Sequence, residues 1–495
     1  MRRALLRSLF GTTKHERTKG VTDDAYSSVP STHDSSFAWQ LRYFMLMPIM
    51  LADLEFFFAL TILGLLENLL SLLLLPLKLV FAFQRFERRD GVALVLIIVG
   101  MLTYYSISLQ TTQPYAYLYH FVRRTSFIKL MMIFSILEVA DKLLSVLLHG
   151  AMEVLTACVQ DWEHTRQLCT RRGDVFSNLW LPLGSAAVCL LCVSAHSIVL
   201  LLSVVTLNVA VNTEGNLLLT FIVSSSLSEL KGIAYKKQNC ESLYQVAAAD
   251  AIERVKFLLF SAVMVLQHMH ERNHGLDIAD TLLVLLAEIV VDFTKHLFVA
   301  KFNRISLSVY RSFYQLTLID MASETVLWRL TDVCVRCIDD LRHLGSELKG
   351  LLKPSSSFLP KYVRRTGFVP VPYAALILWS LAPLACPLLK SDLRLLTLAL
   401  IMMVLLKLAM SELIHGAASR FVVRSMLVPD TQNSRYETGA PTLYGVSPLA
   451  TPAVSPLRGS PKQSEGGSFL TLQLTSFLCS LIKIEPFDLQ TGKGG

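Results

Sequence analysis

Long apolar stretches separated by short polar segments occupy most of this chain, from about residue 39 to residue 415. Several stretches reach about the 20 residues that an α-helix needs to cross a bilayer. They are residues 56–80, 92–109, 179–211, 276–299, 371–389 and 395–414. Because a single segment can satisfy its own backbone hydrogen bonds in lipid only as a helix, this pattern predicts an all-α, polytopic membrane protein, with several amphipathic helices along the interface. We expect the polar flanks, 1–38 and 416–495, to be mostly disordered.

Two helical segments carry charged or polar residues at helical spacing within apolar sequence. We refer to them as the first stripe, Glu288, Asp292, Lys295 and His296, and the second stripe, Glu138, Asp141, Lys142, Ser145, His149 and Glu153. Charged groups inside a membrane need partners or water, so both stripes are candidates for packing helices together or binding a partner protein. Lys295 and His296 follow Asp292 at i+3 and i+4, which predicts that they supply its cation.

The stripes also permit other interpretations. A solvated helix face would explain them without any function. A transporter or channel could use the same side chains to line a water-filled path, although no internal repeat supports this alternative.

Composition agrees with a membrane protein. Hydrophobic residues make up 53% of the chain and charged residues only 17%, with a mean hydropathy of +0.49. The net charge of +8 is spread over loops and tails, so it predicts contact with membrane lipids and no binding of nucleic acid.

Basic residues suggest a topology. Arg85, Arg88 and Arg89 precede the stretch 92–109 and belong in the cytosol under the positive-inside rule. The N-terminal tail is also basic, so we expect 44–80 to enter and leave the membrane on one side, as a hairpin. Both termini are then cytosolic. In the C-terminal tail four serine or threonine residues precede proline and are candidates for phosphorylation: Ser447, Thr451, Ser455 and Ser460.

One catalytic motif is present. His270, Glu271 and His274 fit the H-E-x-x-H pattern, in which two histidines bind zinc and the glutamate activates water. That chemistry needs a rigid helix, whereas Asn273 and Gly275 favour a turn, so we expect the helix to stop inside the motif. An intramembrane zinc metalloprotease at 270–274 therefore stays an alternative. The main expectation is a protein that is not an enzyme, with no bound metal or cofactor.

Several polar blocks resemble the transmembrane anterior-posterior transformation protein family, whose members are multispanning membrane proteins of the eukaryotic endoplasmic reticulum. The similarity extends from about residue 40 to 415. The blocks are Tyr119-His120, 127–130, 137–144, 206–212, 224–237, Asp250 with Glu253-Arg254, and 291–303. Ser225, Ser226 and Phe293 depart from the residues usual in the family, and the H-E-x-x-H motif is not typical of it.

The resemblance implies residence in the endoplasmic reticulum membrane and a non-enzymatic role as a scaffold. It implies support of the folding or quality control of secretory-pathway proteins, together with a membrane protein that bears a luminal SUN-like domain. In animals it implies a link to cilium formation and development.

Overall fold

The computed structural model describes residues 36–81, 88–110, 114–160, 177–211, 240–271, 278–303, 305, 309–322, 359–391 and 393–427. These residues form helices joined by turns, which confirms the all-α prediction. The long helices are α3 (Ser36–Leu73), α5 (Arg88–Gln110), α7 (Phe127–Gln160), α9 (Ser177–Val211), α11 (Cys240–Glu271), α12 (Ile278–Asn303), α17 (Pro370–Ser391) and α18 (Leu393–Leu427). The shorter helices are α4 (Leu75–Phe81), α6 (Pro114–Arg123), α13 (Val309–Ala322) and α16 (Lys361–Thr366).

Within the described residues, 4 helices are long and apolar enough to cross a membrane. The spans are Phe44–Leu73, Arg88–Ile107, Pro182–Ala210 and Arg394–Phe421. Residues 278–299 of the predicted stretch 276–299 lie in α12, which is not one of the four because the first stripe places several charges within a short distance. The predicted stretch 371–389 lies in α17, whose apolar part Pro370–Leu384 is shorter than the four spans.

The hairpin expected for 44–80 is wrong. Helix α3 continues without interruption to Leu73, and the amide of Lys78 bonds to the carbonyl of Leu74 at 3.0 Å, so helical hydrogen bonding resumes directly in α4. The acidic residues that suggested a break have cations on other helices. Asp53 lies 3.6 Å from Arg311, and Glu67 lies 3.8 Å from Lys407. Because these charges are paired, the chain can stay helical through them.

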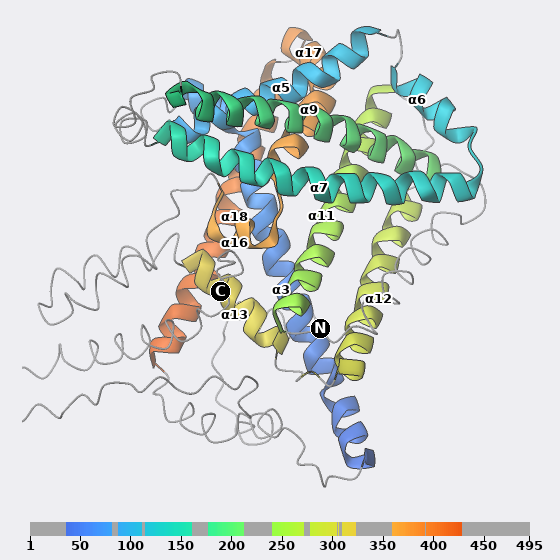
Figure 1. Cartoon of the computed structure of the whole chain (residues 1–495), viewed down its shortest axis with the longest axis vertical. Helices are drawn as coiled ribbons and strands as arrows, with labels where there is room; N and C mark the ends of the chain where they lie inside the picture. The colour runs from blue at the N-terminus through green and yellow to red at the C-terminus, as the bar shows by residue number, and fades with distance from the viewer. Residues whose placement is uncertain are drawn as a thin grey trace, which may run out of the picture.

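The helices run in two main directions. Helices α7 and α9 lie side by side and pass across α3, α11 and α12 (Figure 1). Helix α11 contacts α3, α9, α12, α16 and α17, so it joins the two groups. Apolar side chains from both groups form one large core cluster, and a second cluster gathers around the N-terminal half of α11, with α3, α12 and α13.

The C-terminal membrane helix is longer than predicted. Helix α18 runs to Leu427, beyond residue 415, where we expected the membrane domain to end. The four phosphorylation candidates, Ser447, Thr451, Ser455 and Ser460, lie outside the described residues.

Candidate functional site

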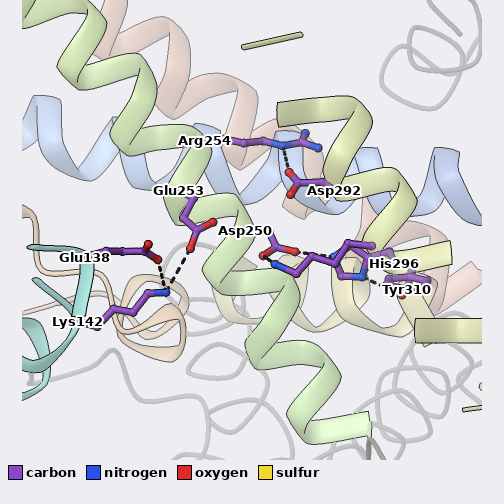
Figure 2. A network of polar contacts seen from close by, with 9 residues as sticks. Glu138, Lys142, Asp250, Glu253, Arg254, Asp292, His296 and Tyr310 are labelled. Carbon is purple, nitrogen blue, oxygen red and sulfur yellow. Dashed lines mark hydrogen bonds and ion pairs between the residues drawn. The ribbon is translucent and has the colours of Figure 1, made fainter. Parts of the chain in front are cut away.

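A buried acidic residue of α11 binds the cationic end of the first stripe. Lys295 donates to Oδ1 of Asp250 with 2.6 Å between Nζ and Oδ1, and Nε2 of His296 lies 2.9 Å from Oδ2 (Figure 2). The other ring nitrogen of His296 lies 3.0 Å from the hydroxyl of Tyr310 on α13. Asp250 therefore connects α11 to α12 directly and to α13 through the imidazole.

One turn further along α11, an arginine binds the acidic part of the same stripe. Arg254 donates from Nε to Asp292 at 2.7 Å and from a terminal nitrogen to Glu55 of α3 at 3.1 Å. Its guanidinium carbon also lies 4.2 Å from the ring centroid of Phe58, a distance at which a cation and an aromatic face attract each other. A single side chain thus ties α11 to α12 and α3.

The whole first stripe is buried. Glu288, Asp292, Lys295 and His296 are each at most 4% exposed, and Asp250 and Arg254 at most 5%. The interpretation of this stripe as a solvated face is therefore wrong. Meanwhile Leu286 and Val290 on the other side of α12 are more than half exposed. Helix α12 turns its charges inward and its apolar side chains outward, as expected of a helix in an apolar medium.

The predicted partners within the first stripe are also corrected. We expected Lys295 and His296 to neutralise Asp292 along their own helix. In the structure both bind Asp250, while Asp292 binds Arg254, so the strong contacts cross between helices. An exposed pair along one helix surface gains only tenths of a kcal/mol.

The second stripe is divided between two environments. Lys142 lies 2.7 Å from Glu138 and 3.3 Å from Glu253 of α11, and its side chain is 48% exposed (Figure 2). His149 lies 3.5 Å from Glu153, which also pairs with Arg364. These pairs lie at the edge of the helix packing.

Asp141, in contrast, is a buried meeting point of four helices. Its carboxylate contacts Nε2 of His196 on α9 at 2.5 Å, Nζ of Lys256 on α11, and the hydroxyl of Tyr373 on α17, which donates at 3.1 Å. Burial alone raises the pKa of this carboxyl, but the hydrogen bond from His196 and the charge of Lys256 outweigh it and hold the pKa below its ordinary value. Asp141 is therefore an ionised acceptor.

Sequence reasoning about single helices missed the partners on α11. Asp250, Glu253 and Arg254 follow each other at i, i+3 and i+4 just before an apolar run, and Lys256 follows closely. This is the same kind of pattern as in the first stripe, and it would have marked α11 as the complementary helix. His196 of α9 is fully buried and bonded to Asp141.

The described residues hold no group of three His, Cys, Asp or Glu side chains that could bind a metal ion. Helix α11 ends at Glu271. The side chains of His270 and Glu271, and the whole of His274, lie outside the described part of the chain.

The geometry described so far links seven helices through buried, charge-assisted hydrogen bonds. The three cations Arg254, Lys256 and Lys295 each lie within bonding distance of an acidic group on another helix. Removing one partner of such a pair strands a buried charge, which costs far more than removing an exposed pair. The network is suited to fixing the relative positions of helices.

Comparison with known proteins gives one family. Residues 83–423 match the family described as "Eukaryotic membrane protein family". Protein TAPT1 homolog of Dictyostelium discoideum is 32% identical over 217 residues, which cover 40% of this chain and 25% of that protein. The Transmembrane anterior posterior transformation protein 1 homologs of Xenopus laevis and Homo sapiens are 30% and 29% identical over 269 residues.

Both alignments cover 53% of this chain, and 43% of the frog and 41% of the human protein. The chain thus spans less than half the length of these curated relatives. No solved structure matches it.

Proposed function

Because this chain belongs to the eukaryotic membrane protein family of the transmembrane anterior posterior transformation proteins, we propose that it is a non-enzymatic membrane scaffold. It holds partner proteins in the membrane of the endoplasmic reticulum and supports the folding or quality control of secretory-pathway proteins. The family membership and the multispanning architecture are the premises. The location, the partners and the role in folding are the proposal.

The observation that carries this proposal is the way α11 uses its charges. Asp250 and Arg254 bind α12 and α3, and Lys256 binds α7 through Asp141. Side chains that would otherwise be candidates for catalysis or transport are thus occupied in joining helices. A scaffold needs such fixed geometry, since a partner binds most tightly to a surface that is ordered before it arrives.

The proposed partner is a membrane protein with a luminal SUN-like domain, as the resemblance to the family implies. The test is purification of the tagged native protein in mild detergent, with mass spectrometry of the proteins that accompany it. The matched control is Lys295→Met, which breaks one buried pair of the network. We expect a discrete membrane partner with the native chain and its loss with the variant. Recovery of the same proteins as with an unrelated membrane protein would contradict a scaffold role.

Location and topology have their own test. We propose that both termini are cytosolic and that the chain resides in the endoplasmic reticulum. Tags at each end should be digested when protease is added to sealed microsomes, while a luminal marker stays protected. Protection of the C-terminal tag would contradict this topology and also the phosphorylation of the Ser-Pro and Thr-Pro sites.

The two alternatives, a zinc metalloprotease and a transporter or channel, each predict a result that a scaffold does not give. If the H-E-x-x-H motif were catalytic, Glu271→Gln would abolish function at normal protein abundance, because the water-activating carboxylate would be missing. We expect the Glu271→Gln variant to replace the native protein in cells that lack it. A transporter or channel would show ion or solute flux in proteoliposomes that Asp250→Asn changes, whereas a scaffold shows none.

A further inference from the structure

One membrane helix of this protein is covered far less than the others. In the most apolar window of the span Arg394–Phe421, which lies in α18, only 11% of the residues are buried. The corresponding share is 28% for Arg88–Ile107, 44% for Phe44–Leu73 and 56% for Pro182–Ala210. Helix α18 packs on α3, α13 and α17, and its buried residues Met410, Ile414 and Ala418 lie on one side. Among the described residues of α18, most of those on the other side are exposed.

The open side carries an acidic residue. Glu412 is exposed and lies roughly opposite Met410 and Ile414 around the helix. Small residues flank it on the same side, with Ala409 at i−3 and Gly416 at i+4, and a Cβ added at Gly416 would meet nothing within 4 Å. Small residues let the backbone of a second helix approach closely in a membrane.

The other acidic residues of the four spans all have cations. Asp53 lies 3.6 Å from Arg311, Glu55 lies 3.1 Å from Arg254, Glu67 lies 3.8 Å from Lys407, and Asp90 lies 2.5 Å from Lys78. Glu412 is the exception, since it has no cationic partner among the residues that the structure describes. Its neighbour His415 contacts the carbonyl of Ser411 through Nδ1.

An unpaired carboxylate on an apolar, exposed helix is costly in a bilayer. Glu412 lies within the apolar span Arg394–Phe421, five residues or about 7.5 Å along the helix after Lys407. We propose that the open face of α18 around Glu412 binds a membrane-spanning helix of another protein, which presents a lysine or arginine at the same depth. This inference rests on the proposed scaffold function and assigns it a surface.

A second copy of this chain fits the face poorly. Two copies with the same orientation in one membrane pair through a two-fold axis along the membrane normal. Such an axis at this face places Glu412 opposite its own equivalent, where like charges repel. Lys407, the cation of α18 that lies closest to Glu412 in the sequence, is already paired with Glu67.

The test is photocrosslinking of the full-length protein in its native membrane. A photoreactive amino acid in place of Leu408 lies on the same face as Glu412, because the two positions are four residues apart. One in place of Leu406 points about 120° away from Glu412, because each residue of a helix turns the direction of its side chain by about 100°. The two positions are matched in exposure, at 51% and 55%. We expect the probe at 408, and not at 406, to form an adduct with a membrane-spanning peptide that contains lysine or arginine.

Substitution of the charge then tests the pairing. Glu412→Gln should lower the adduct yield about tenfold, while Glu412→Asp should retain most of it. Once the peptide is sequenced, Glu412→Lys should abolish the adduct, and exchanging the partner's cation for glutamate should restore it. Unchanged size-exclusion profiles of each variant in detergent show that the chain is folded.

Three results would overturn the inference. They are adducts with lipid alone, adducts with a second copy of this chain, and a yield that does not respond to Glu412→Gln. If tagged protein still recovers a partner that Lys295→Met releases, the scaffold proposal survives and only the surface on α18 is wrong. If no partner is recovered and the adducts are lipid, both proposals fail.

Discussion

The ammonium group of Lys295 lies 2.6 Å from the carboxylate of Asp250, and both side chains are buried. The two residues come from neighbouring helices, α12 and α11, and are 45 residues apart in the sequence. A buried pair of this kind adds little net stability compared with a pair of apolar residues, but it penalises any arrangement that separates its members. The pair therefore acts mainly on how α11 and α12 are placed.

We predict that Lys295→Met strongly destabilises the protein, by about 3–5 kcal/mol, because it strands a carboxylate in the core. Adding Asp250→Asn should recover part of the loss, since the carboxylate that Lys295 binds is then neutral and His296 keeps a polar partner. Adding Asp292→Asn instead should recover nothing, because it also removes a partner of Arg254. The measurement is the midpoint of thermal unfolding in detergent, followed by fluorescence-detected size exclusion. Equal recovery by both second substitutions would contradict the assignment of Asp250 as the partner.

The sequence predicted the helices well and the contacts of the first stripe poorly. Apolar runs of sufficient length have only one stable backbone form in lipid, so stretches such as 92–109 and 395–414 predicted helices at the right places. Helical periodicity also placed Glu288, Asp292, Lys295 and His296 on one face correctly. It could not say which helix would face them, because that depends on packing between segments distant in sequence. The assumption that Asp292 pairs within its own helix failed for that reason.

A second prediction concerns Arg254. Arg254→Lys keeps the charge but loses the planar fork that serves Asp292 and Glu55 at once, and it weakens the contact with Phe58. We expect a destabilisation of about 1.5–3 kcal/mol, the range for hydrogen bonds to charged groups. Arg311→Lys is the matched control, because Arg311 is 38% exposed in its side chain and lies 3.6 Å from Asp53. Its unfolding midpoint should change little, and equal shifts for both variants would show that the fork of Arg254 has no special role.

The third prediction compares two acidic residues of α7. Asp141→Asn weakens contacts with His196, Lys256 and Tyr373 on three other helices, and it leaves the partly buried ammonium of Lys256 without its carboxylate. Glu138→Gln removes only a pair with Lys142, whose side chain is 48% exposed. We expect Asp141→Asn to lower protein abundance and the unfolding midpoint clearly, and Glu138→Gln to cost less than about 1 kcal/mol. If Glu138→Gln had a larger effect than Asp141→Asn, the exposed part of the second stripe would matter more for stability than its buried part.

The last prediction uses glycines to test how closely the helices pack. Gly100 of α5 faces α17, and a Cβ at this position would lie 2.7 Å from the Cβ of Ala375 and 3.2 Å from the hydroxyl of Ser197. The Cβ of Ala375 is fixed to its backbone, so Gly100→Ala must push α5 and α17 apart.

We expect that separation to cost about 1–3 kcal/mol, as overpacking of a core does. Gly150 on α7 is the control, because a Cβ there would meet nothing within 4 Å. Gly150→Ala should raise the unfolding midpoint, since alanine favours a helix over glycine by up to about 1 kcal/mol. Opposite shifts of the midpoint would confirm the close contact of α5 with α17. If Gly100→Ala were also stabilising, helix propensity would outweigh the clash, and the contact between these two helices would have to be looser than the structure shows.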